Sequence, residues 1–107
     1  MEVKVILGVL EMFRTLDAEM PIGQITAFLT ISESGDAGVT MTDLSEKLGI
    51  GISTCSRHIG ALGSINRYHE EGHKLISSVE DPTERRRKII TLTFAGKAFL
   101  KRLKERI

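Results

Sequence analysis

The 107-residue sequence contains no tryptophan, one cysteine and two prolines, and aromatic residues make up only 5% of it. A single cysteine cannot form an internal disulfide, which excludes the disulfide framework of a small secreted domain. The first thirteen residues also lack the basic start, the long apolar core and the small-residue cleavage site of a signal peptide. These absences predict a cytoplasmic protein.

Long apolar runs are absent as well. No segment reaches the roughly 18 uncharged residues that a membrane span needs, because Glu11, Arg14 and Asp17 interrupt the apolar N-terminal segment. We therefore expect a soluble protein without a membrane partner, built as one domain over residues 1–107. A chain of this size buries only about two thirds of the surface that it exposes when unfolded, so pairing with a second copy would stabilise it.

Motifs of catalysis and metal binding are missing too. The chain has no glycine-rich phosphate loop and no nucleophile elbow, so we expect neither an enzyme nor a cofactor. His69 and His73, with Glu70 and Glu71 beside them, are the best candidates for a zinc pair. Two imidazoles without a well-spaced third ligand are a weak signal, and Gly72 disfavours a helix through them, so we expect no metal.

Charge is unevenly distributed, although the formal net charge is only +1. Residues 1–50 carry three basic and eight acidic side chains, a net charge of −5, whereas residues 51–107 carry twelve basic and six acidic ones, a net charge of +6. A basic half opposite an acidic half directs positive potential to one side, which is typical of a nucleic-acid-binding protein. Chance clustering of charges is the alternative.

Apolar residues at helical spacing predict four or five helices. The segment from Val3 to Leu16 is apolar over more than one face, which indicates that this helix packs against two partners. A second helix begins at Pro21 and ends near Ser34, and residues 35–39 form a loop. The last helix, 95–107, has an apolar stripe among basic residues. We expect the terminal segments 1–18 and 94–107 to be dimerisation helices.

Residues 40–63 predict two short helices joined by a glycine-containing turn. Thr40 or Thr42 caps the first helix, which ends at Gly49, and the second begins at or near Ser53. The inward residues of the second helix are Cys55, Ile59 and Leu62, and its outward residues are Ser53, Thr54, Ser56 and Arg57. This is the pattern of a helix-turn-helix, whose second helix enters the major groove of DNA. Because Cys55 faces inward, we expect it to pack in the core and not to sense oxidants.

Residues 74–93 predict a β-hairpin with a charged tip. Two β-rich segments, 74–79 and 88–93, flank residues 80–87, in which Asp81 and Glu84 can hold neighbouring arginines. The tip contains three consecutive arginines, Arg85, Arg86 and Arg87. Such neighbours repel one another unless an anion lies between them, so we expect this loop to reach DNA phosphates or a narrow minor groove. A solvated charged loop is the alternative.

Three segments resemble the MarR-type (multiple antibiotic resistance regulator) family of winged-helix transcription regulators. They are residues 20–29, which begin Met-Pro-Ile-Gly-Gln, residues 42–59, and residues 81–96. The third is the most specific, because it reads Asp-Pro-Thr-Glu-Arg-Arg followed by Ile-Thr-Leu-Thr-Phe-Ala-Gly. The resemblance covers most of the chain. It implies a mainly α fold with a small β-hairpin wing, in which dimerisation helices from both chain ends flank a winged helix-turn-helix.

The resemblance also implies a function: a homodimeric repressor that binds double-stranded DNA sequence-specifically. The expected DNA-contacting residues are Thr42, Ser53, Thr54, Ser56, Arg57, His58, Arg85, Arg86 and Arg87. Asp81 matches the acidic residue that braces the wing in this family. Some members bind a small-molecule effector beside the dimer interface, and this sequence does not identify one.

Two questions stay open at this stage. Between Leu62 and Lys74 the chain has more residues than the family usually has, and residues 63–72 either lengthen the recognition helix or form a separate loop. Winged helices also serve as architectural or replication DNA-binding proteins and as protein-interaction modules. Three arginines in the wing favour DNA as the partner, but they do not separate sequence-specific from non-specific binding.

Overall fold

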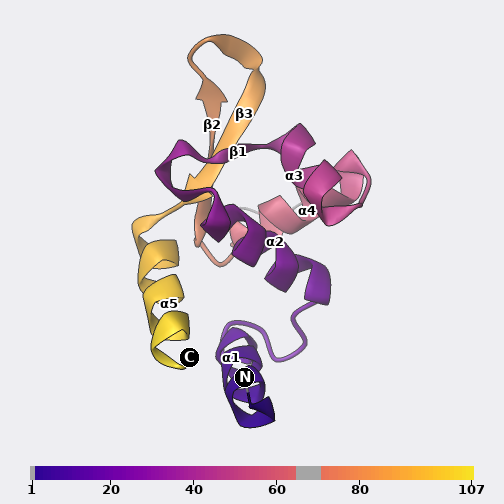
Figure 1. The fold of residues 1–107 in the computed structure, drawn as a ribbon. Helices are drawn as coiled ribbons and strands as arrows, with labels where there is room; N and C mark the ends of the chain where they lie inside the picture. The colour runs from indigo at the N-terminus through magenta and orange to yellow at the C-terminus, as the bar shows by residue number, and fades with distance from the viewer. Residues whose placement is uncertain (1, 65–70) are drawn as a thin grey trace.

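Five helices and a small sheet form the part of the chain that the computed structural model describes, residues 2–64 and 71–107 (Figure 1). The elements follow in the order α1 (Val3–Arg14), α2 (Ile22–Glu33), the 3-10 helix η1 (Gly35–Ala37), β1 (Val39–Thr40), α3 (Met41–Leu48), α4 (Ile52–Leu62), β2 (Ile76–Asp81), β3 (Glu84–Leu92) and α5 (Phe94–Glu105). The predicted class, mainly α with a β-hairpin wing, is confirmed.

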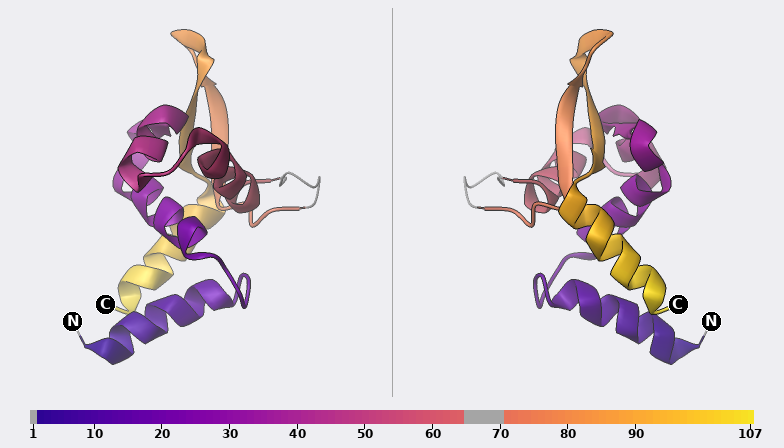
Figure 2. Two further views of the ribbon diagram at one scale, coloured as in Figure 1. Left: turned by 90° about the vertical axis from the view of Figure 1, so that its right-hand side faces the viewer. Right: turned by 90° about the vertical axis from the view of Figure 1, so that its left-hand side faces the viewer.

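The sheet has the strand order β1-β3-β2, with both pairings antiparallel. Strands β2 and β3 form a long hairpin that projects from the helices (Figure 2). Val39 and Thr40 add a short third strand beside Ile90 and Ile89. The prediction of a loop over residues 35–39 is therefore wrong at its end, because Val39 buries its side chain and pairs with β3.

The charged hairpin tip is also shorter than predicted. Strand β2 continues to Asp81 and β3 begins at Glu84, so Pro82 and Thr83 alone form the turn. Residues 85–87 thus belong to a strand and not to a loop. The register pairs Glu80 with Lys88 and then Asp81 with Glu84, so residues 85–87 have no partner on β2 and form an irregular part of the strand next to the turn.

The ends of α3 and α4 settle which residues cap them. Thr40, and not Thr42, caps α3, because its side-chain oxygen accepts a hydrogen bond from the backbone N–H of Asp43. Gly49 ends α3 with a left-handed φ of 67°. Helix α4 begins at Ile52, with Gly51 as its N-cap residue, in agreement with the predicted start at or near Ser53.

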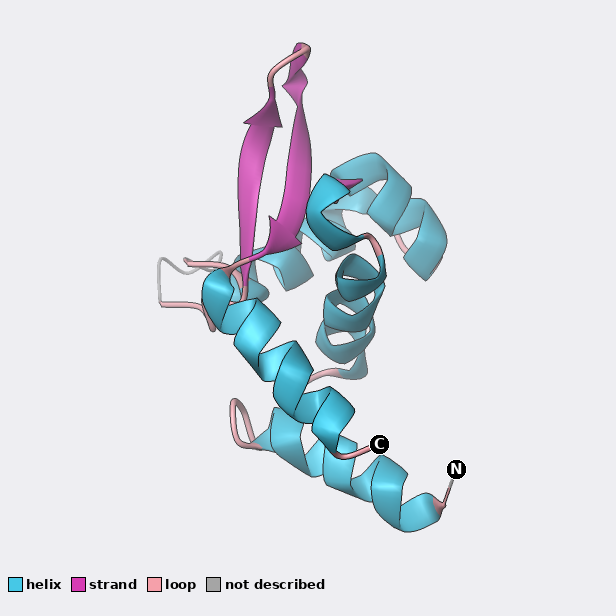
Figure 3. Cartoon of the chain, turned by 60° about the vertical axis from the view of Figure 1, so that its left-hand side comes forward, coloured by secondary structure: helices cyan, strands magenta, loops and turns pink. Residues whose placement is uncertain are grey.

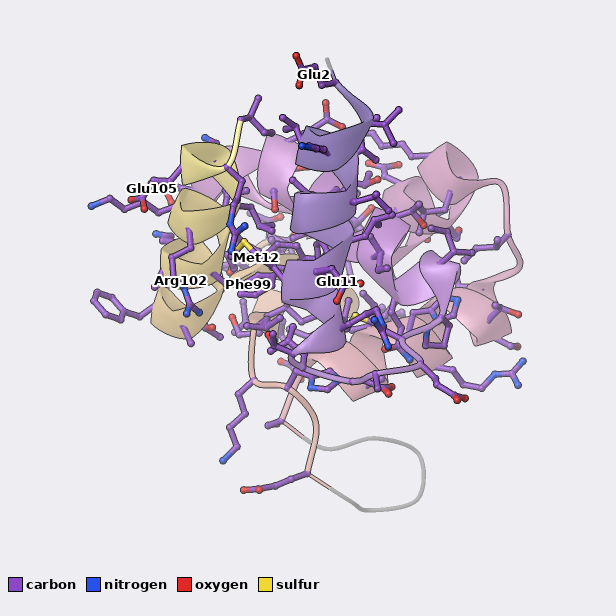
Figure 4. The ribbon with its side chains drawn as sticks, turned by 90° about the horizontal axis from the view of Figure 1, so that it is seen from below. Glu2, Glu11, Met12, Phe99, Arg102 and Glu105 are labelled. Atoms are coloured by element: carbon purple, nitrogen blue, oxygen red, sulfur yellow. The ribbon has the colours of Figure 1, made fainter. Side chains whose placement is uncertain are left out.

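The core is built around three phenylalanines from three helices. Phe13 of α1, Phe28 of α2 and Phe99 of α5 meet edge to face, with ring centroids 5.2–5.9 Å apart. Figure 4 shows Phe99 and Met12 between α5 and α1. Because α2 also packs against α3 and α4, this cluster connects the terminal helices to the helix-turn-helix.

Helices α1 and α5 lie together at the end of the molecule opposite the hairpin (Figure 3). The guanidinium of Arg106 lies near Gly8, so the C-terminal residues lie beside α1. Val3, Ile6 and Leu7 of α1 stay 71%, 45% and 54% exposed. No helix of residues 2–64 and 71–107 is both long and apolar enough to cross a membrane.

Candidate nucleic-acid interface

Helix α4 presents the exposed polar face that its sequence predicts. Cys55, Ile59 and Leu62 are buried on its inner side, where α4 packs against α2 and α3. On the outer side Ser53, Ser56 and Arg57 are exposed, and Thr54 is half-buried. Arg57 Nη2 lies 3.4 Å from Thr54 Oγ1, along the helix surface. This face carries short hydroxyl side chains and one guanidinium, which suit the edges of base pairs.

His58 is held differently from its neighbours on α4. Its ring is half-buried against the backbone of Gly23 in α2, where a side-chain carbon on residue 23 would collide with the imidazole. Burial, and then the positive charge of Arg57, lower the pKa of His58. His58 is thus a packing residue between α4 and α2, and its expected contact with DNA stays a prediction.

Cys55 has no exposed surface, and burial raises the pKa of its thiol. A thiol in this state is a poor nucleophile because the thiolate form is disfavoured. The position agrees with a packing role, as the inward stripe of α4 predicts.

Asp81 organises the turn of the hairpin. Its Oδ1 accepts hydrogen bonds from the backbone N–H and the hydroxyl of Thr83, at 2.9 and 2.8 Å, and its Oδ2 accepts one from Arg87 Nη2 at 3.2 Å. The hydrogen bonds from Thr83 and the charge of Arg87 lower the pKa of Asp81. These contacts are compatible with the bracing role that the resemblance implies for Asp81, which stays a prediction.

The three arginines of β3 differ in their surroundings. Arg87 pairs with Asp81 and lies 3.8 Å from Glu84, measured from Nε to Oε2. Arg86 is exposed, and no ion pair involves it within the described structure. The backbone of Arg85 lies in β3, but its side chain is outside the described part.

A cleft of about 330 Å³ brings the predicted residues of α3, α4 and β3 together. Its lining residues are Met41, Thr42, Ile52, Ser56, Arg86, Arg87 and Lys88. Thr42, Ser56 and two arginines, selected from separate parts of the sequence, therefore share one site. Ser53, Thr54, Arg57 and His58 do not line this cleft.

Sequence reasoning missed Lys88. This residue lines the cleft above and also a second one, of about 570 Å³, between α4 and the hairpin. The signal was present in the alternation of β3, because Lys88 shares a strand face with the buried Ile90.

The segment after α4 answers one open question. Gly63 has an extended backbone, so α4 ends at Leu62 and is not lengthened. On the return, the N–H groups of His73 and Leu75 donate to the carbonyls of Ala61 and Leu62. His69, one histidine of the weak zinc pair, and its neighbour Glu70 lie outside the described residues.

Comparisons with known proteins agree with this geometry. Residues 29–65 match the family model described as "Winged helix-turn-helix DNA-binding". No curated protein matches the chain in sequence.

Among solved structures, the chain is similar to a complex of Staphylococcus aureus MepR with DNA, with a TM-score of 0.74 and 21% identity over 90% of this chain and 69% of that one. The repressor CouR bound to a 23-mer DNA duplex matches with a TM-score of 0.69 and 23% identity, over 97% of this chain and 65% of that one. The regulator PcaV from Streptomyces coelicolor, in complex with its natural ligand, matches with a TM-score of 0.65 and 23% identity. The match covers 89% of this chain and 61% of that one.

The chain thus spans 61–69% of the length of these three proteins. TM-scores of 0.65–0.74 establish a shared fold, and identities of 21–23% show no more than that fold. Together with the match over α3 and α4, they show that the chain has the winged helix-turn-helix fold of MarR-type transcription regulators.

Proposed function

We propose that this protein is a sequence-specific double-stranded DNA-binding transcription regulator, and that it acts as a dimeric repressor without catalytic activity. One observation carries the proposal: the exposed polar face of α4 and the basic strand β3 border a common cleft, at the end of the molecule away from α1 and α5. A helix and a hairpin placed this way fit a major groove and the adjacent minor groove.

The residues fall into two groups by the kind of contact that they offer. On α4, Ser53 and Arg57 carry exposed hydrogen-bonding groups that suit base edges. On β3, Arg86 carries a positive charge that suits phosphate oxygens. The similar structures of MepR and CouR are complexes with DNA, which supports the same role here.

We expect the dimer interface at the opposite end of the molecule, where α1 and the C-terminus lie. The apolar side chains of Val3, Ile6 and Leu7 are exposed on α1, and Ile107 is 71% exposed at the C-terminus. Large apolar side chains gathered on a terminal helix favour a second copy as their cover, because burying them removes apolar surface from water. A two-fold dimer would present two α4 helices to one face of DNA, and repression would follow from covering a promoter.

Selection of bound duplexes from a random DNA library at near-physiological salt tests this function. We expect an inverted repeat whose half-sites lie about one helical turn apart. Binding without an enriched sequence, but with steep salt dependence, would instead indicate an architectural or replication protein. A protein that retains no DNA at all would contradict the proposal and indicate a protein-interaction module.

A further inference from the structure

The groove between α4 and the hairpin is the feature that the proposed function leaves unexplained. Two clefts adjoin there, of about 330 and 570 Å³, and Met41, Ser56 and Lys88 line both of them. Ser56 and Lys88 therefore mark the middle of one continuous groove between the helix and the strand. Neither helix nor hairpin has a side chain that fills it.

Helix α4 turns a distinct face to this groove. Ile52, Ser56 and Gly60 line it, and they follow one another at intervals of four residues, as residues on one helix face do. Ser53 and Arg57 line neither cleft and lie about 100° further round the helix. The outer surface of α4 thus has two parts, one toward the hairpin and one away from it.

The hairpin supplies the charge of this groove. Lys88 is exposed and lies on the strand face of Ile90, which is turned toward the helices. Glu80 stands opposite Lys88 in the β2–β3 pairing, yet within the described structure no ion pair joins Lys88 to any carboxylate. Lys74, at the other end of the groove, is paired with Glu71 at 2.7 Å. Arg86, at the hairpin end of the groove, is also without an ion pair in the described structure, so Lys88 is the available cation at the middle of the groove, where both clefts meet.

We infer that Lys88 and Ser56 together bind a phosphate of the DNA backbone, an inference that rests on the proposed function. If α4 lies in a major groove and the hairpin tip lies at the adjacent minor groove, the sugar-phosphate strand that separates the two grooves crosses between them. Lys88 supplies the charge and Ser56 a hydroxyl donor, and the small Ser56 and Gly60 leave room for the strand. In this arrangement Ser53 and Arg57, on the part of α4 away from the hairpin, contact the base edges.

The test compares two duplexes of equal length, the selected sequence and a scrambled one, by fluorescence anisotropy over a range of KCl concentrations. We expect Lys88→Gln to weaken binding to both duplexes about tenfold, the loss typical of one hydrogen bond to a charged group. The slope of log K against log salt should fall by about 0.9. Ser56→Ala should give a smaller loss, again equal on both duplexes, and Lys88→Arg should restore most of the affinity.

Lys101→Gln is the matched control, because it removes the same charge from an exposed position on α5. Unchanged affinity and salt slope in Lys88→Gln, equal to those of Lys101→Gln, would overturn the inference while the proposed function stands. A loss confined to the selected duplex would also overturn it, because that result is the signature of base reading. Wild-type protein that binds neither duplex would overturn the proposed function, and this inference with it.

Discussion

Arg87 donates a hydrogen bond from Nη2 to Oδ2 of Asp81 at 3.2 Å, across the turn that joins β2 to β3. The same carboxylate holds the backbone of Thr83, so one buried group connects the turn to the strand that carries the arginines. Arg87 is therefore held within the hairpin, whereas Arg86 beside it is exposed and takes part in no ion pair of the described structure.

The two arginines should therefore contribute unequally to DNA binding. We expect Arg86→Gln to weaken binding to all duplexes and to lower the salt slope by about 0.9, because an available charge is lost. Arg87→Gln should change the slope less, since Asp81 already offsets its charge. Salt titrations of both variants measure the difference, and equal slopes would contradict it.

Gly23 is expected to leave room for the imidazole of His58, because it carries no side chain. Gly23→Ala would force the imidazole away, and because this ring is the half-buried end of a rotatable side chain, the cost should be about 1 kcal/mol of unfolding free energy, at the low end for overpacking. DNA affinity should fall as well, because His58 lies on α4. Urea unfolding measures the first effect. The double variant Gly23→Ala with His58→Ala should recover most of the stability lost by Gly23→Ala, and a double variant as unstable as the sum of the two single ones would argue against the contact.

Stability should also depend on pH through His58. Its pKa in the folded protein is lower than its ordinary value of 6.5, so the unfolded chain binds more protons between the two values. Unfolding free energy should therefore decrease as pH falls from about 7.5 through 6.5 toward the lowered pKa, below which the loss is complete. Thermal melts of wild type and His58→Gln over this range test the expectation, and parallel pH profiles would show that His58 is not responsible.

A carboxylate on the exposed face of α1 should separate the subunits. Leu7→Glu places a charge on a side chain that is 54% exposed, so the monomer should still fold, but an apolar dimer interface could not accept it. Sedimentation should show a monomer and DNA binding should weaken. Ala37→Glu, which adds the same charge to an exposed position in η1, should stay dimeric. A dimeric Leu7→Glu would place the interface elsewhere.

Cys55 should react slowly with alkylating agents in the folded protein. It has no exposed surface and its pKa is raised, so both access and thiolate formation are suppressed. Labelling in native buffer and in urea compares the two states, and full reaction should require unfolding. Rapid labelling of the native protein would instead favour an oxidant-sensing role.

The sequence alone determined the helices, the turn at Gly49 and the inward stripe of α4, because these depend on local spacing and on single residues with strong conformational preferences. The sequence could also predict contacts of Asp81 at the hairpin turn, because its partners Thr83 and Arg87 are near it in the chain.

Tertiary structure decided what local preference leaves open. Val39 lies in a strand because it pairs with Ile90 of β3, and the second strand begins at residue 84 because Glu84 pairs with Asp81 across the turn. The placement of His58 against Gly23, and of Lys88 beside Ser56, depends on elements distant in the chain. Periodicity shows which side of an element is polar, but only packing decides which polar side chains face one another, and that arrangement defines the candidate site.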